Sequence, residues 1–385
     1  MTSNNLNLGI DASNIRVGGG LTHLSELLQT FDPIKHGFKK IFCWASSPTL
    51  ASIEDRPWLV KNSIHNINRN ILYHTFWKST ELNKLAKKAK CDILFVPSGT
   101  FFTNFRPIVT MSQNLLPFDL KELFRYRLSL MMMKFIMLRL LQTYSFRKAN
   151  GTIFLTQFAK NSTCKVTGTL KGKTPIIPHG IDERFFQHLI HQNKISNYSH
   201  ENPFRLIYVS TIEPYKHQWH VAKAVAKLRA KGYSIVLDFI GSAKPAILKR
   251  LQKTIRKVDP DGTYIRYVGP VPHCQIQLYY SKADIAIFAS SCETFGQILL
   301  EGMASGVPTA CSKMSSMKEI IGDAAVYFHP ENPESIVSAI ERYIGSSELR
   351  AKKAQIGYQK AKQFSWQRCA DETFSFLAEV AKEHM

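Results

Sequence analysis

Acidic residues are scarce in this 385-residue chain, which carries 29 Asp and Glu against 50 Lys and Arg and has a formal net charge of +21. Such an excess predicts attraction to an anionic partner, such as nucleic acid, an anionic membrane surface or phosphorylated substrates. The signals of a nucleic-acid reader are missing, since the sequence has no zinc-finger, helix-turn-helix or RNP spacing. We therefore expect no nucleic-acid partner.

Cysteines are few and unpatterned. The seven lie at 43, 91, 164, 274, 292, 311 and 369, an odd number without any C-x-x-C. This argues against a disulfide framework and a zinc site, and it predicts a reducing cytoplasm and no metal cofactor. The first residues, MTSNNLNLGIDASN, lack the charged-then-apolar layout of a signal peptide, so we do not expect secretion.

No apolar run is long enough to predict a membrane span. The most apolar stretch, residues 128–141, is interrupted by Lys134 and Arg139 and falls short of the roughly 20 residues that a spanning helix needs. The surrounding segment, 120–148, is rich in Met, Leu, Phe and cations. It predicts an interfacial helix on an anionic membrane, with core helices whose cations reach the surface as the alternative. The expected membrane contacts are Arg125, Arg127, Lys134 and Arg139.

Short apolar runs that end in small or polar residues alternate with helical spacing along the chain. The first is LNLGIDA (6–12), followed by GGG (18–20) and then by leucines at helical spacing. Alternating strands and helices imply a parallel sheet covered on both faces. The predicted strands are 6–12, 40–46, 91–99, 106–113, 150–157, 204–211, 234–242, 263–271, 284–291 and 306–312.

This alternation stops and restarts once. Residues 186–203 are polar and end in proline, as a linker would. The sequence therefore predicts an α/β protein of two Rossmann-like, doubly wound domains, 1–185 and 204–364, and then an amphipathic helix over 365–385. Because ligands bind beyond the carboxyl ends of parallel strands, we expect the chemistry in loops that follow strands, drawn from both halves.

The stretch SSCETFGQILLEGMASGVP (290–308) places two carboxylates, Glu293 and Glu301, around a predicted strand-to-helix turn. Gly296 would let a ligand approach the backbone, and the first amides of a helix attract hydroxyl or phosphate oxygens. Glu301, over a turn into the helix, could accept two hydrogen bonds from a vicinal diol such as a ribose. A helix-terminal charge beside a solvated surface residue is the alternative.

The run ETFGQILLEGMASGVP (293–308) resembles the signature of retaining nucleotide-sugar glycosyltransferases of the GT-B type, family 4. The stretches MSQNLLPF and IFLTQFAK resemble the sequences of bacterial enzymes that build O-antigen or other surface polysaccharide. The resemblance implies two domains facing across a cleft, with the terminal helix packing back on the first. The other stretches that fit the family are GGG (18–20), PHGID (178–182), the lysine of STIEPYKHQ (210–218), PENPESIVSAI (330–340) and FSW (364–366).

The resemblance also implies roles for single residues. The catalytic roles fall to Glu293, which would contact the donor sugar, and to Lys216, which would neutralise the donor diphosphate. A fixed cation stabilises a leaving diphosphate most in the transition state. Glu301 would hold the ribose. The other implied donor-binding residues are Gly19, Gly20, Thr211, Gly241, Thr294, Phe295 and Gly296. The implied acceptor or cleft residues are Gly18, Gln113, Asn114, His179 and Asp182.

Two positions depart from the family pattern. Many relatives carry an arginine near the lysine, where this chain has Thr211 and Tyr215, so Arg184 or Lys244 would supply a second cation unless Lys216 works alone. Relatives also often have a His-Asp pair where this chain has Gln113 and Asn114. Amide side chains donate and accept hydrogen bonds but cannot act as a general base.

The resemblance implies a retaining hexosyltransferase that uses a nucleotide diphosphate sugar such as UDP- or GDP-hexose. The expected acceptor is lipid-linked or a growing polysaccharide, and the expected location is the cytoplasmic face of the inner membrane. Two alternatives stay open. One is a GT-B enzyme with a soluble acceptor, of the disaccharide synthase or phosphorylase type. The other is a basic membrane- or nucleic-acid-binding scaffold without activity.

Overall fold

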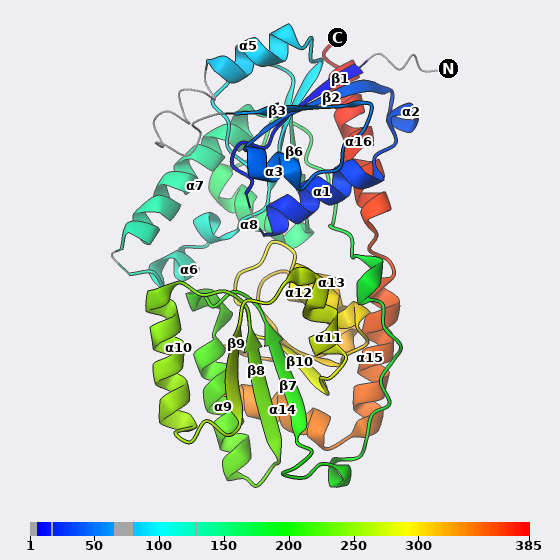
Figure 1. Cartoon of the computed structure of the whole chain (residues 1–385). Helices are drawn as coiled ribbons and strands as arrows, with labels where there is room; N and C mark the ends of the chain where they lie inside the picture. The colour runs from blue at the N-terminus through cyan, green and yellow to red at the C-terminus, as the bar shows by residue number, and fades with distance from the viewer. Residues whose placement is uncertain (1–5, 17, 65–79, 128) are drawn as a thin grey trace. The chain divides into compact units, whose positions relative to one another are not determined.

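The computed structural model describes residues 6–16, 18–64, 80–127 and 129–385. The chain forms two compact units, each built on a six-stranded parallel sheet with helices around it (Figure 1). Unit 1 comprises Met1–Leu123, Leu128–Gly180 and Ser365–Met385, and unit 2 comprises Phe124–Arg127 and Ile181–Phe364. The α/β class with two Rossmann-like domains, predicted from the alternation of strands and helices, is confirmed.

The sheet of unit 1 has the order β3-β2-β1-β4-β5-β6. The chain builds outward from β1 in one direction and then returns to add β4 on the other side, so the sheet has its switch point between β1 and β4. The central strands are apolar because helices cover both faces. The strands are β1 Leu6–Asp11, β2 Phe38–Ala45, β3 Leu59–Ser63, β4 Ile93–Val96, β5 Ile108–Ser112 and β6 Gly151–Phe154.

Helices of unit 1 include the last one of the chain, α16 (Trp366–Lys382), which packs against α1 (Gly19–Thr30). Ser365 caps α16 by accepting a hydrogen bond from the amide of Arg368. This finding confirms that the C-terminal helix returns to the first unit. The other helices are α2 Pro33–His36, α3 Ser47–Ala51, α5 Glu81–Lys88, η1 Leu116–Phe118, α6 Leu120–Phe124, α7 Leu130–Lys148 and α8 Gln157–Thr167.

The sheet of unit 2 repeats this plan with the order β12-β11-β10-β7-β8-β9. Its switch point lies between β7 and β10. These strands are neighbours in the sheet, although 75 residues lie between Val209 at the end of β7 and Ile285 at the start of β10. The loops that follow β7 and β10 therefore emerge side by side. The strands are β7 Phe204–Val209, β8 Ile235–Ile240, β9 Ile265–Gly269, β10 Ile285–Phe288, β11 Thr309–Ser312 and β12 Ala325–Phe328.

The helices of unit 2 alternate with these strands and bury their apolar faces on the sheet, as α14 does with Ile336, Val337 and Ile340. The remaining bounds are η2 Glu183–Phe185, η3 Ile195–Asn197, η4 Pro214–Lys216, α9 Gln218–Ala230, α10 Pro245–Val258, η5 His273–Gln275, α11 Ile276–Tyr280, α12 Gln297–Ala304, α13 Met317–Ile321, η6 Gly322–Ala324, α14 Pro333–Ile344 and α15 Ser347–Ala361.

Residues 186–203, expected to be a linker, group with unit 2. The fully buried Arg350 of α15 donates hydrogen bonds to the Gln192 side chain and to the Asn193 carbonyl, and its guanidinium lies over the ring of Phe204. A buried cation needs such acceptors. This stretch is therefore packed onto the second sheet in spite of its polar composition.

Candidate functional site

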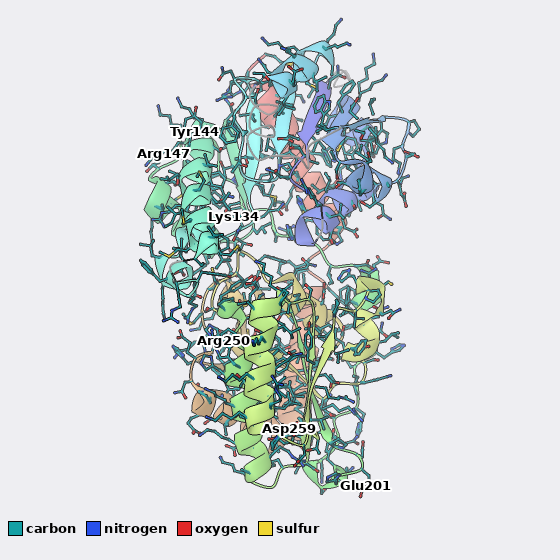
Figure 2. The ribbon with its side chains drawn as sticks, turned by 60° about the vertical axis from the view of Figure 1, so that its left-hand side comes forward. Lys134, Tyr144, Arg147, Glu201, Arg250 and Asp259 are labelled. Carbon is teal, nitrogen blue, oxygen red and sulfur yellow. The ribbon has the colours of Figure 1, made fainter. Side chains whose placement is uncertain are left out.

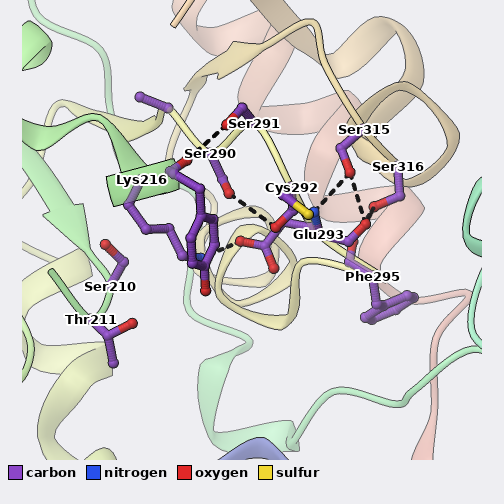
Figure 3. Close-up of polar contacts among 12 residues, drawn as sticks. Ser210, Thr211, Lys216, Ser290, Ser291, Cys292, Glu293, Phe295, Ser315 and Ser316 are labelled. Carbon is purple, nitrogen blue, oxygen red and sulfur yellow. Dashed lines mark hydrogen bonds and ion pairs between the residues drawn. The ribbon is translucent and has the colours of Figure 1, made fainter. Parts of the chain in front are cut away.

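The loop after β10 brings Glu293 to the switch point of unit 2. The apolar β10 ends at Phe288, and Gly296, with φ +98°, begins α12 in a left-handed conformation that favours glycine. Two serines from the loop after β11 fix the Glu293 backbone (Figure 3). The Glu293 amide donates to the Ser315 hydroxyl at 2.7 Å, and the Ser315 and Ser316 hydroxyls donate to the Glu293 carbonyl at 2.8 and 3.1 Å.

Lys216, in the loop after the neighbouring β7, forms an ion pair with Glu293 through its Nζ and the Oε1 (Figure 3). Both side chains are largely buried, with 6% and 17% of their surfaces exposed. The Lys216 Nζ also lies 5.2 Å from the ring centre of Tyr215 and 5.1 Å from that of Phe288. Taking a charge out of water costs free energy unless the charge is paired, so the burial of each of these two side chains depends on the charge of the other.

The backbone around Lys216 is held by the β10 loop. The Ser291 amide and hydroxyl donate to the Tyr215 carbonyl at 2.9 and 3.2 Å, and the His217 Nε2 lies 2.9 Å from the Ser291 hydroxyl. The Tyr208 hydroxyl donates to the Lys216 carbonyl at 2.6 Å. Burial, followed by the charge of Glu293, raises the pKa of Tyr215 well above its usual range, so this hydroxyl stays protonated.

Gly241 lies where the loops after β7 and β8 cross. A Cβ at this position would lie 2.1 Å from the Ser210 carbonyl oxygen, and the φ of Gly241 is +142°. The Gln218 side chain donates to the Ser210 hydroxyl and to the Thr211 carbonyl at 2.8 and 3.0 Å. Gly241 is therefore needed for the backbone that presents Thr211, which is itself exposed.

Glu301, in α12, is only 3% exposed and is bound by a histidine that the sequence analysis did not single out. The His273 Nε2 lies 2.8 Å from the Glu301 Oε1, and the Arg184 Nη2 lies 2.6 Å from the His273 Nδ1. Asp182 in turn accepts from the Arg184 amide at 2.9 Å. These contacts connect Glu301 to half-exposed polar groups, and they place Arg184 with Glu301.

Lys244, the other candidate for a second cation, does not join the contacts around Glu301 and instead lies near Glu213. Its Nζ is 3.7 Å from the Glu213 Oε1, and the Glu213 carbonyl accepts from the Lys216 amide at 3.0 Å. The Glu213 carboxylate also accepts from the Tyr126 hydroxyl at 3.1 Å. Lys244 is thus attached to the Lys216 loop, while Arg184 is attached to Glu301.

Unit 1 gathers four of the predicted acceptor or cleft residues beyond the carboxyl ends of β1 and β5. Gly18 is the N-cap of α1, and a Cβ on Gly20 would lie 3.4 Å from the Gln113 Oε1. Asn114 accepts from the Leu116 amide at 3.1 Å, which makes it part of a turn. His179 stacks on the fully buried His23, with ring centres 4.8 Å apart. Asp182, the fifth predicted residue, belongs to unit 2 instead.

His23 was missed by the sequence analysis although it follows the glycines in α1. Its Nδ1 lies 3.5 Å from the Gln113 Nε2, and Trp366 of α16 lies 6.1 Å from its ring. Burial, followed by the neighbouring His179, holds the pKa of His23 well below its usual range. The ring is therefore neutral at pH 7 and can only donate or accept hydrogen bonds.

Other residues were missed because their roles come from tertiary contacts. His273, Ser315 and Ser316 all lie in loops that follow strands, β9 for the first and β11 for the two serines. The rule that ligand sites form beyond the carboxyl ends of strands could have selected these loops, but it could not have selected the residues.

The four cations predicted to contact a membrane differ in their surroundings. Arg125, which groups with unit 2, forms an ion pair with Glu331 of the same unit through two hydrogen bonds, with N···O distances of 2.6 and 3.2 Å. Arg139 donates to the Pro117 carbonyl at 3.1 Å. Lys134 and Arg127 are exposed. Within the described residues, no helix combines the length and the apolarity that crossing a bilayer requires.

Among the described residues, no group of three or more His, Cys, Asp or Glu side chains is arranged to hold a metal ion. The charged groups of the site in unit 2 are instead paired with one another.

Comparison with known proteins finds similarity in the second half of the chain. Residues 191–360 match the family model described as glycosyl transferases group 1. O-antigen chain mannosyltransferase B of Escherichia coli is 29% identical over 172 residues, which cover 44% of this chain and 44% of that protein. The chain thus matches less than half the length of this curated relative.

Two solved structures share the fold over nearly the full length. Sucrose-phosphate synthase from Thermosynechococcus elongatus has a TM-score of 0.77 at 16% identity, covering 98% of this chain and 100% of that one. Anabaena HepE in complex with UDP and glucose has a TM-score of 0.68 at 16% identity, covering 99% of each. Residues 191–360 are therefore similar to group 1 glycosyltransferases, and the chain as a whole has the GT-B fold.

Proposed function

We propose that this protein is a retaining hexosyltransferase that moves a hexosyl group from a nucleotide diphosphate sugar, UDP- or GDP-hexose, to a lipid-linked or growing polysaccharide acceptor. The observation that carries the proposal is the buried Lys216–Glu293 ion pair beside Gly296, with Glu301 in the helix that follows. The relatedness to an O-antigen mannosyltransferase and the UDP and glucose bound by a protein of the same fold support it.

The ion pair supplies a mechanism. A donor diphosphate would compete with Glu293 for Lys216, because a diphosphate carries more charge than a carboxylate. Lys216 would then counter the charge that develops on the leaving group, and Glu293 would be released to accept hydrogen bonds from the sugar hydroxyls. Glu301 would accept hydrogen bonds from the ribose, with His273 holding its carboxylate.

Retention is part of the proposal. The departing phosphate would take the acceptor proton on the same face of the sugar, so no dedicated base is needed. This fits the amides Gln113 and Asn114, which stand where many relatives have His-Asp. Because Lys216 supplies the positive charge, we propose that transfer needs no metal ion, and activity should survive chelation by EDTA.

The acceptor and the location complete the proposal. One relative is an O-antigen chain mannosyltransferase, and we propose that this chain likewise builds a surface polysaccharide, at the cytoplasmic face of the inner membrane. A disaccharide synthase type of enzyme would instead transfer to a soluble sugar without lipid, and a scaffold without activity would bind no nucleotide sugar.

The test has a binding and a transfer stage. Thermal shift against UDP-, GDP-, ADP- and dTDP-sugars should select one nucleotide. Transfer to a lipid-linked acceptor should then be abolished by Lys216→Ala and by Glu293→Ala, while the exposed-pair variant Lys227→Ala keeps it. Undiminished turnover in both site variants would refute the catalytic roles, and the absence of any nucleotide-sugar binding by the folded protein would favour the scaffold.

A further inference from the structure

The outer side of α7 carries an apolar stripe on the surface of unit 1. Of the large apolar side chains that are exposed among the described residues, six lie in this one helix, and they are 41% to 84% exposed. They are Leu130, Met133, Ile136, Met137, Leu140 and Tyr144. The other exposed ones beyond residue 150 lie singly, at Phe158, Leu189, Val268, Leu278 and Met385. Scattered apolar residues are ordinary, but a contiguous stripe marks a binding surface.

Helical spacing aligns these side chains. Leu130, Met133, Met137, Leu140 and Tyr144 follow one another at intervals of three and four residues, so they form one row along the helix. The opposite side of α7 is apolar too, and its residues Met132, Phe135 and Phe146 are buried in unit 1. A surface helix normally has one apolar side, because the other faces water. The second apolar side of α7 is therefore the side that an apolar partner would cover.

Cations accompany the stripe, and acids do not. Residues 130–148 contain Lys134, Arg139, Arg147 and Lys148 but neither Asp nor Glu. Lys134 is exposed and lies one turn from both Leu130 and Met137, and Lys148 is exposed at the end of the helix. Figure 2 shows Lys134 toward one end of α7, and Tyr144 and Arg147 toward the other. Long cationic side chains of this kind can reach phosphate groups beside a buried apolar row.

We propose that the outer side of α7 docks lengthwise on an anionic lipid bilayer. Leu130, Met133, Met137, Leu140 and Tyr144 enter the boundary between headgroups and acyl chains, and Lys134 and Lys148 contact lipid phosphates. A second copy of the chain fits this side poorly, because it would bring the same cations face to face on a protein of net charge +21. The proposal goes beyond sugar transfer and needs no part of the site in unit 2.

This surface changes the expected role of the cations. Arg125 is engaged by Glu331, and Arg139 by the Pro117 carbonyl. The apolar row should therefore carry most of the binding, with Lys134 and Lys148 adding a contribution that salt weakens.

The test measures binding of the full chain to vesicles of phosphatidylethanolamine and phosphatidylglycerol by flotation. The triple variant Met133→Gln, Met137→Gln, Leu140→Gln removes the row while keeping good helix formers, and it should weaken binding at least about tenfold. The matched control is the double variant Phe158→Gln, Leu278→Gln, which changes two exposed apolar residues elsewhere and should bind as the parent does. Equal circular dichroism melting curves would show that both variants fold.

A second set of variants separates the contribution of the lysines from that of the apolar row. Lys134→Gln with Lys148→Gln should weaken binding to these vesicles but leave the weaker binding to phosphatidylcholine vesicles unchanged. Undiminished flotation of the triple variant would overturn the proposal. It would also be overturned if the parent protein ignored all vesicles and formed a dimer that the triple variant lost, because the stripe would then be an interface between copies.

Discussion

Lys216 and Glu293, which lie in the loops after two neighbouring strands, β7 and β10, form a largely buried ion pair in unit 2. Removing one partner leaves the other charged and uncompensated. We expect Lys216→Met to cost about 3 kcal/mol of stability, or roughly 6 °C or more in the melting temperature. The double variant Lys216→Met, Glu293→Gln removes both charges and should recover part of that loss, but not the transfer activity.

The exposed pair Lys227–Glu334 is the control for this cycle, with side chains 49% and 64% exposed. The variants Lys227→Met and Glu334→Gln should each change stability by less than about 1 kcal/mol. If the double variant Lys216→Met, Glu293→Gln is no more stable than Lys216→Met alone, then the cost of burying Glu293 does not depend on the charge of Lys216.

Glu301 leads to a prediction about binding rather than chemistry. If its carboxylate accepts hydrogen bonds from the ribose, Glu301→Gln should weaken donor affinity about tenfold to a hundredfold and raise KM more than it lowers kcat. Glu293→Gln should instead act mainly on kcat. Calorimetry with the selected nucleotide measures the first effect, and Glu341→Gln, in a surface pair with Lys231, is the control. Unchanged affinity in Glu301→Gln would place the ribose elsewhere.

The sequence predicted the central strands and the loops of the candidate site, because buried parallel strands read as apolar runs and ligand loops follow them. It missed β3 and β12, which are edge strands. Leu59–Ser63 is polar and half-buried, and Ala325–Phe328 has only four residues. The polar sequence hid β3 and the shortness of the run hid β12, whereas the edge strands β6 and β9 were predicted.

Side-chain partners were harder to predict than elements. The pairing of Arg125 with Glu331 joins residues 206 positions apart, and His273 meets Glu301 only because the loop after β9 returns to α12. Neither position is marked by periodicity or by a local motif. Arg125 was therefore predicted to contact a membrane, and His273 was not singled out in the sequence.

His23 should make stability depend on pH. Its pKa is lowered in the folded state, so unfolding takes up a proton, and the stabilisation present above the unfolded pKa of 6.5 is lost as the pH falls below it. The melting temperature of the parent should fall more steeply between about pH 7 and 5 than that of His23→Gln. His200→Gln, at an exposed histidine, should follow the parent. Parallel curves for parent and His23→Gln would contradict the assignment.

Gly241 offers a test of the backbone that supports Lys216 and Thr211. In Gly241→Ala the new Cβ would meet the Ser210 carbonyl oxygen at 2.1 Å, and the φ of +142° is one that alanine rarely adopts. Because the obstacle is backbone, the loop after β7 must move, and we expect a loss of more than about 2 kcal/mol together with weaker donor binding. Gly357→Ala in α15 is the matched control, since its Cβ would meet Met303 at an ordinary 3.5 Å and a helical alanine replaces a glycine. It should be neutral or slightly stabilising, so equal melting temperatures for the two variants would mean that the crossing of the β7 and β8 loops tolerates a side chain at Gly241.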